Sequence, residues 1–234
     1  MGRVSIFRSA SFSRFFSRIF FALAYPFFAF RTGPIWVKGL SSTKNALDTG
    51  IPLLIYCNHT SCYDGFLVHR IAKLLRPDCF FVLPMVEREY VRRRYFSLLG
   101  AIPLSKSASS IRYFVRALEN IRTAQKERLV LAYFPQGRIT PSTCRDLKFE
   151  RGLEFLVPRL SPIQCVPAAI QFEMLQGTRP QIFFTLGVPI QNPIQTVEFE
   201  QRVQLLLTET RAEIEELGED FGAHHRPDWE QISW

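Results

Sequence analysis

Two short polar segments contain the residues best suited to chemistry. The first covers residues 58–65 and reads NHTSCYDG, with four residues between His59 and Asp64. These two side chains can meet where a strand turns into a helix, so that the carboxylate fixes the imidazole tautomer and leaves the other nitrogen free as a base. The spacing therefore fits a pair that deprotonates a substrate hydroxyl. It also fits a histidine held by a capping aspartate at a helix start.

The second segment covers residues 134–140 and reads FPQGRIT. Proline and glycine shape a turn, and Gly137 would let a ligand approach the backbone closely. Arg138 could hold a phosphate through paired hydrogen bonds. Taken alone, the segment fits a surface turn with an exposed arginine equally well.

The elements that position these segments alternate along the chain. Buried strands are expected over 52–56, 79–83 and 129–134, and further strands over 35–37, 101–104, 164–172 and 181–186. Helices are expected over 64–75, 87–99, 109–126, 149–160 and 197–217. This alternation predicts a single α/β domain with a mixed, largely parallel sheet flanked by helices. Both polar segments follow predicted strands, at the carboxyl ends where functional loops of such sheets lie.

Charge is concentrated at the N-terminus. The chain has 29 basic and 21 acidic residues, and residues 1–47 hold seven basic residues and no acidic one. Residues 48–234 are therefore nearly neutral, which argues against a nucleic-acid-binding domain. Nine of the 22 phenylalanines lie in the first 30 residues, around an uncharged run of twelve residues, 19–30. A membrane-spanning helix needs roughly 20 apolar residues, so this run is too short to cross a bilayer.

We therefore predict that residues 1–33 form a basic, aromatic segment lying on a membrane surface, on its cytoplasmic face, and that residues 34–234 form the catalytic domain. A signal peptide and an ordinary core helix are the alternatives. The five cysteines have neither a disulfide framework nor zinc-site spacing, so reduced thiols and no metal are expected.

Four sequence blocks, taken in order, resemble the glycerolipid acyltransferases, which include 1-acylglycerol-3-phosphate and related lysophospholipid acyltransferases. The blocks are residues 58–65, 100–106, 134–140 and 166–170. The resemblance implies that His59 and Asp64 are the catalytic pair, with Asn58, Ser61 and Gly65 in the same block. Lys106 stands where the family usually has arginine, and Gln136 where it usually has glutamate. The other residues assigned to these blocks are Phe134, Pro135, Gly137, Arg138 and Pro167.

The resemblance also implies a reaction. His59 would act as general base on the hydroxyl of a lysophospholipid such as 1-acylglycerol-3-phosphate, and the oxygen would attack an acyl thioester, either acyl-CoA or acyl-ACP (acyl carrier protein). Lys106, Gln136, Gly137 and Arg138 would bind substrate. The partners would be the membrane lipid acceptor, the acyl donor and the membrane surface, with no nucleic acid, no metal and no cofactor beyond the co-substrate. Cys62 would not be needed as a nucleophile.

Other functions stay open at this point. Gln136 could mark a non-phosphate acceptor, such as a glycolipid or an amino-acid lipid, or a loss of activity. A non-catalytic peripheral lipid-binding protein would share the N-terminus and the basic loops but would not depend on His59. A serine hydrolase would need a G-x-S-x-G elbow, and the sequence has neither this motif nor a nucleotide-binding glycine fingerprint.

Overall fold

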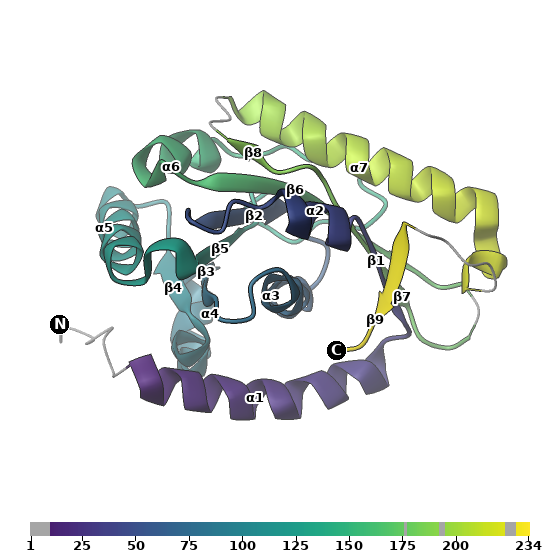
Figure 1. The fold of residues 1–234 in the computed structure, drawn as a ribbon, viewed down its shortest axis with the longest axis horizontal. Coiled ribbons are helices and arrows are strands. Elements are labelled where there is room, and N and C mark those ends of the chain that lie inside the picture. Colours follow the sequence, from purple (N-terminus) through teal and green to yellow (C-terminus); the bar gives the residue numbers. More distant parts are fainter. Residues whose placement is uncertain (1–9, 176, 192–194, 223–227) are drawn as a thin grey trace.

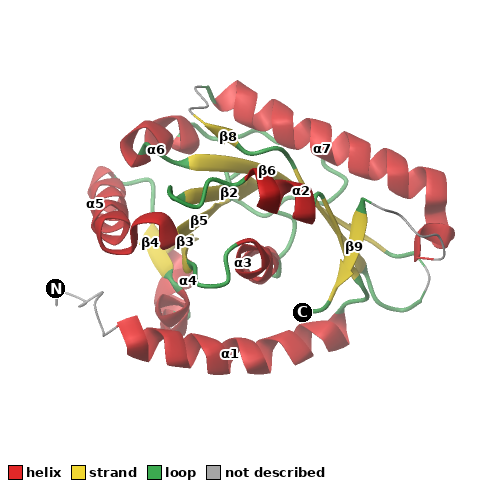
Figure 2. Ribbon diagram, viewed as in Figure 1, coloured by secondary structure: helices red, strands yellow, loops and turns green. Residues whose placement is uncertain are grey.

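A computed structural model describes residues 10–175, 177–191, 195–222 and 228–234 of the chain. The elements alternate as expected (Figures 1 and 2). The helices are α1 (Ala10–Arg31), α2 (Leu40–Ala46), α3 (Asp64–Leu75), α4 (Glu87–Arg92), α5 (Ala108–Gln125), α6 (Gly152–Leu160) and α7 (Thr196–Leu217), with short 3-10 turns at Arg94–Leu99, Lys126–Arg128 and Gly218–Gly222. The strands are β1 (Ile35–Lys38), β2 (Leu53–Cys57), β3 (Phe80–Val86), β4 (Ala101–Leu104), β5 (Leu129–Tyr133), β6 (Gln164–Glu173), β7 (Gln181–Leu186), β8 (Ile190–Gln191) and β9 (Trp229–Ile232).

One mixed sheet organises the described chain. Its strand order is β4-β3-β5-β2-β6-β7-β1-β9, and β8 pairs with β6. The five strands from β4 to β6 run parallel to one another. Direction changes at the antiparallel β6–β7 pair, and β9 closes the other edge antiparallel to β1. The predicted single α/β domain with a largely parallel sheet is therefore confirmed.

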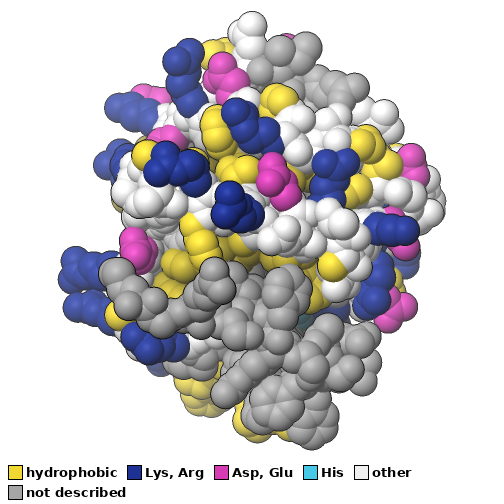
Figure 3. Space-filling view, turned by 90° about the vertical axis from the view of Figure 1, so that its left-hand side faces the viewer, with side chains coloured by type: hydrophobic (Ala, Val, Ile, Leu, Met, Phe, Trp, Pro, Cys, Tyr) yellow, Lys and Arg dark blue, Asp and Glu magenta, His cyan; other side chains and the backbone are white. Residues whose placement is uncertain are grey.

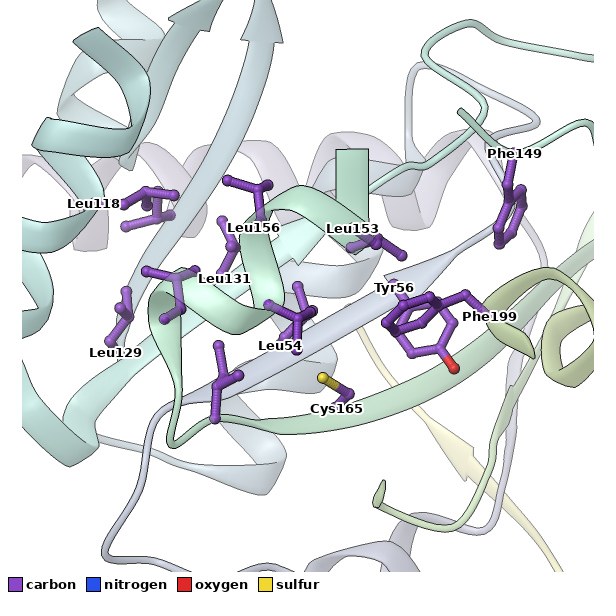
Figure 4. Close-up of a cluster of buried hydrophobic side chains, with 14 of the residues drawn as sticks. Leu54, Tyr56, Leu118, Leu129, Leu131, Phe149, Leu153, Leu156, Cys165 and Phe199 are labelled. Carbon is purple, nitrogen blue, oxygen red and sulfur yellow. The ribbon is translucent and has the colours of Figure 1, made fainter. Parts of the chain in front are cut away.

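Helices cover both faces of this sheet, so the central strands are buried on both sides and carry almost uninterrupted apolar sequence. Leu54 and Tyr56 of β2 face the layer formed by α5, α6 and α7, where they join a large cluster of apolar side chains (Figure 4). Leu53 and Ile55 point the opposite way, toward α3 and α2. The alternation follows from the two-residue period of a strand.

Helix α1 forms an additional layer that packs on α3 rather than on the sheet. Figure 1 shows it running along the side of the molecule opposite α7. Phe21 and Phe28 are buried on its inner side and pack against Phe66 of α3, edge-on and tilted, with ring centroids 6.2 and 4.6 Å from that of Phe66. Its outer side exposes four large apolar residues, which are Ile19, Leu23, Phe27 and Phe30.

No helix among the described residues is long and apolar enough to cross a membrane. Residues 1–9 of the predicted N-terminal segment lie outside the described part of the chain, and the boundary predicted at residue 33 follows the end of α1 at Arg31.

The structure departs from the predicted elements in several places. The single helix expected over 87–99 divides at Arg93, whose backbone leaves the helical region, and a 3-10 turn continues to Leu99. Gly100 ends this turn with φ 87°, where a Cβ would lie 2.0 Å from the carbonyl oxygen of Phe81. Strand β3 continues through Pro84 to Val86, beyond the predicted end at residue 83. Helix α2, the two-residue strand β8 and the edge strand β9 were not predicted, because none of them shows a distinct apolar period in the sequence.

Candidate active site

The parallel part of the sheet brings the two polar segments together. Strands β2 and β5 are neighbours in parallel register, so the segments that follow Cys57 and Tyr133 leave the same edge of the sheet. Strand β4, two positions away from β5 in the same direction, sends the segment containing Lys106 toward this edge as well. Three of the four sequence blocks thus converge through strand direction alone.

His59 and Asp64 form a direct pair at this edge. The imidazole Nδ1 of His59 lies 2.8 Å from a carboxylate oxygen of Asp64. The His59 side chain is 21% exposed, whereas that of Asp64 is fully buried. With Nδ1–H donating to the carboxylate, the lone pair of His59 lies on Nε2, which has no hydrogen-bond partner in the described part of the chain. The arrangement leaves one imidazole nitrogen without a partner among the described residues, on a side chain that is partly exposed.

The buried Asp64 carboxylate is held by four donors. One oxygen accepts from His59 and from the backbone amides of Thr60 and Ser61, at 2.6 and 2.9 Å. The other oxygen accepts from the Ser61 hydroxyl at 2.6 Å. Asp64 is also the first residue of α3, where the helix dipole favours a negative charge. The loop therefore satisfies a buried carboxylate while fixing its orientation toward the imidazole.

The second polar segment clamps the backbone of His59. Gln136 is buried, and its Oε1 accepts from the His59 amide at 2.6 Å. Its Nε2 donates to the Thr140 hydroxyl, while the Thr140 amide donates to the His59 carbonyl at 2.8 Å. The ring of Phe134 stacks on the imidazole with a centroid separation of 4.2 Å. The segment that follows the neighbouring strand β5 thus holds both the backbone and the ring of His59 in place.

Other motif residues support this frame. The Asn58 side chain makes two 2.8 Å hydrogen bonds with the backbone of Ile170, which ties the end of β2 to β6. Pro167 lies opposite Tyr56 in the same strand pair. A Cβ on Gly65 would lie 3.1 Å from a methyl of Leu83, so a small residue here lets α3 approach β3.

The rim of the site carries exposed charges. Lys106 donates to Glu150 at 2.6 Å, and the two side chains are 87% and 50% exposed. Arg138 is exposed and has no ionic or hydrogen-bonded partner within the described residues. Gly137 adopts a left-handed backbone with φ 65°. Figure 3 shows lysine and arginine side chains spread over the face that carries α5, with apolar atoms between them.

A partly buried tyrosine lies beneath this rim. Burial, together with the negative charge of Glu150, raises the pKa of Tyr133 to about 12. Tyr133 therefore stays protonated at neutral pH. Its hydroxyl packs against Gly152, where a Cβ would lie only 2.0 Å away, so we assign it a packing role at the start of α6.

The structure places every predicted site residue on this one edge or on the strands that support it. Gln136 differs from the others, because its side chain is turned inward to the His59 backbone. Two further residues take part that sequence reasoning did not assign, namely Thr140 and Glu150. Thr140 lies inside the second polar segment, so its position was a usable signal. Glu150 lies outside the blocks and had none. No group of three metal-ligating side chains occurs in the described part of the chain.

Comparison with known proteins identifies the family of the chain. A sequence model of the family described as Acyltransferase matches residues 39–171, more than half of the chain. The chain belongs to the acyltransferase family. The matched residues of this acyltransferase include the His59–Asp64 pair, Lys106, the 134–140 segment and Glu150.

The acyltransferase fold also resembles a solved structure, the crystal structure of the 1-acyl-sn-glycerophosphate (LPA) acyltransferase PlsC from Thermotoga maritima. The TM-score is 0.50 at 16% sequence identity, and the similarity covers 88% of this chain and 79% of that chain. At this identity the likeness concerns the fold. No curated protein sequence matches this acyltransferase.

Proposed function

We propose that this acyltransferase moves a fatty acyl group from an acyl thioester to the hydroxyl of a lysophospholipid. The observation that carries the proposal is the 2.8 Å pair between His59 and the buried Asp64, which leaves Nε2 of His59 unpartnered among the described residues. A hydroxyl placed at this nitrogen would lose its proton as it attacks. General base catalysis of this kind typically contributes ~10²–10⁴-fold in rate.

The proposed transfer passes through a tetrahedral intermediate. Nε2 of His59 takes the hydroxyl proton while the oxygen forms a C–O bond to the thioester carbonyl carbon. Asp64 stabilises the resulting imidazolium through Nδ1–H. The tetrahedral intermediate then collapses, the C–S bond breaks, and the imidazolium returns its proton to the leaving sulfur. The products are the acylated lipid and a free thiol, with no acyl-enzyme.

The developing oxyanion needs donors outside the His59 loop. The amides of His59, Thr60 and Ser61 already donate to Gln136 and Asp64. These amides position the catalytic pair, so they are not free to stabilise negative charge on the substrate.

Lys106 and Arg138 are the proposed contacts for the acceptor phosphate. Both cations are exposed at the edge where His59 lies, and Gly137, directly before Arg138, is also exposed. The acyl group would arrive on CoA or on acyl carrier protein. The proposed chemistry uses neither a resident cofactor nor a metal, because proton transfer and thiol departure complete it.

We further propose that α1 rests on the cytoplasmic surface of a membrane. Its exposed side presents Ile19, Leu23, Phe27 and Phe30 at helical spacing, with Arg31 at its end. Aromatic and aliphatic side chains of this kind enter the acyl boundary, while arginines meet anionic head groups. Such placement would deliver a membrane lipid to the domain.

Acyl transfer by purified protein tests the proposed reaction. Labelled acyl-CoA and acyl-ACP are offered with lysophospholipids and with non-phosphate lipid acceptors, and His59→Ala is assayed beside the wild type. Product from a lysophospholipid that disappears in the variant supports the proposal. Product only from a glycolipid or amino-acid lipid would replace the proposed acceptor. No product from any pair, with folded and vesicle-bound protein, would favour a non-catalytic lipid-binding function.

Vesicle flotation tests the proposed membrane surface. Leu23→Glu with Phe27→Glu should abolish flotation with vesicles containing anionic lipid. The matched control is Val197→Glu with Leu205→Glu, which places the same charges on exposed apolar positions of α7, on the opposite side of the molecule (Figure 1). Equal binding by both double variants would contradict the role of α1.

A further inference from the structure

Glu150 places a negative charge where the proposed acceptor phosphate must bind. Its carboxylate lies 2.6 Å from the ammonium of Lys106. A Cβ built on Gly137 would lie 3.4 Å from its carboxyl carbon and from both of its oxygens. The carboxylate therefore rests over the turn between Gln136 and Arg138, and it pairs with Lys106, one of the two cations proposed for phosphate.

The backbone fixes Glu150 at this position. Its amide donates to the carbonyl of Pro135 at 2.9 Å, which ties residue 150 to the same turn that holds His59 through Gln136. Glu150 thus belongs to the frame of the site, even though it lies ten residues beyond the second polar segment. Its carboxylate is half exposed, so a bound head group can reach it.

A ligand can displace the ion pair between Glu150 and Lys106. Both partners are exposed, and exposed ion pairs contribute little free energy because water and salt screen them. A phosphate could take over Lys106 and add Arg138. Glu150 would then be left beside the phosphate without its cation. A phosphomonoester with two negative charges would be repelled, whereas a head group with its own cation would replace Lys106 as the partner.

We propose that Glu150 selects lysophospholipids whose head group carries an ammonium next to a phosphodiester. The phosphate contacts Lys106 and Arg138, and the ammonium pairs with Glu150. This inference rests on the proposed lysophospholipid acyltransferase function and narrows its acceptor class. Glu150 acts here as a specificity-determining residue and takes no part in the bond-making steps.

Three acceptors separate charge from size. Lysophosphatidylethanolamine carries the ammonium, lysophosphatidylglycerol has a phosphodiester without it, and 1-acylglycerol-3-phosphate has a phosphomonoester. The kcat/KM for each is measured for the wild type, for Glu150→Gln and for a matched control. The control is Asp146→Asn, which removes an exposed carboxylate that pairs with Lys148 at 3.4 Å in the same loop.

We expect the wild type to favour lysophosphatidylethanolamine over each of the other two. Glu150→Gln should reduce this preference roughly two- to fivefold, the size expected for one exposed ion pair, mainly through KM. Asp146→Asn should keep the wild-type ratios. The melting temperature of each variant checks that the fold is retained.

Two results would overturn the inference and leave the acyltransferase function standing. One is a wild type that favours 1-acylglycerol-3-phosphate, with the same ratios in Glu150→Gln. The other is an equal loss on all three acceptors in Glu150→Gln, which would mean that Glu150 only orients Lys106. No product from any acceptor in the wild type would overturn both the inference and the proposed function.

Discussion

Two histidines that lie ten residues apart occupy opposite environments. His59 is partly exposed at the end of β2, with a carboxylate on Nδ1 and no partner on Nε2 among the described residues. His69 is buried in the middle of α3, where its Nδ1 lies 2.8 Å from the Tyr25 hydroxyl and its ring stacks on Phe21 at 3.6 Å. The first environment favours proton transfer, and the second favours a neutral ring that joins two helices.

The difference is the reason why we propose His59, and not His69, as the base. Burial, together with the nearby cations Lys73 and Arg70, lowers the pKa of His69 from its ordinary value of 6.5 to about 3. His59 instead faces a fixed carboxylate and water. The proposed base has a carboxylate on one ring nitrogen and leaves the other nitrogen accessible. Hydrogen bonding of the ring alone does not make a histidine a base.

Asp64→Asn should produce a large loss, second only to that of His59→Ala, because it removes the charge that stabilises the His59 imidazolium. We expect kcat to fall by at least about a hundredfold, within the range of general base catalysis. In a His59→Ala background the same substitution should change activity little, since Asp64 acts through His59. Steady-state rates of the four proteins, together with their melting temperatures, measure both effects. If the losses of activity in the two single variants multiply in the double variant, the proposal that His59 and Asp64 act as a pair would be contradicted.

Gln136→Leu should have an intermediate effect. It leaves the His59 amide without its buried acceptor, which typically costs about 1–3 kcal/mol of stability, and it loosens the loop. We expect activity to fall about tenfold for a rate change of 1.4 kcal/mol. Gln136→Glu retains an acceptor oxygen and is the matched control, with a smaller loss expected. Equal activity of both variants would show that this clamp does not position His59.

His69→Gln should change activity only a few-fold and should instead alter the pH dependence of stability. Below its ordinary pKa of 6.5 the unfolded histidine binds a proton, whereas folded His69 stays neutral down to about 3. The unfolded state therefore binds more protons than the folded state in this window. As the pH is lowered, the free energy of unfolding of the wild type decreases by up to about 1.4 kcal/mol per pH unit. Denaturant unfolding between pH 7 and 4 should show a shallower decline for the variant. Identical slopes would contradict the buried neutral ring.

Cys62→Ser should have the smallest effect. This exposed thiol lies between His59 and Asp64, so it is the natural candidate for an acyl-enzyme nucleophile. Direct transfer to the lipid hydroxyl predicts activity within about twofold of the wild type, because one exposed surface group contributes little. The assay is the same transfer reaction, with mass spectrometry for an acylated protein. Loss of transfer together with an acyl group on Cys62 in the wild type would contradict direct attack.

Local sequence patterns predicted the frame of this molecule well. Helix α3 begins and ends where the pattern places it, at Asp64 and Leu75, because its apolar spacing and the proline at 77 are local signals. Strand direction then accounts for the meeting of the two polar segments. The edge strand β9 depends on pairing with β1, which is distant along the chain, so no local apolar period predicts it.

The candidate site was predicted less completely. The pairing of His59 with Asp64 follows from their spacing, and it is present. Gln136 was expected to face a substrate, but its partner is the backbone of His59, a contact between residues 77 positions apart that the sequence does not reveal. Glu150 was missed for a related reason. Nothing in the sequence distinguishes this acidic residue from others in a charged loop. Only the fold brings it next to Lys106 and Gly137.

The central claim is that His59 is the base that activates the acceptor hydroxyl. The most direct measurement is the rate of labelled acyl transfer from a thioester to a lysophospholipid by the wild type, His59→Ala and His69→Gln, at matched folded fraction. We predict a loss of ~10²–10⁴-fold for His59→Ala and a loss of only a few-fold for His69→Gln. A folded His59→Ala protein that transfers the acyl group at the wild-type rate would contradict the claim.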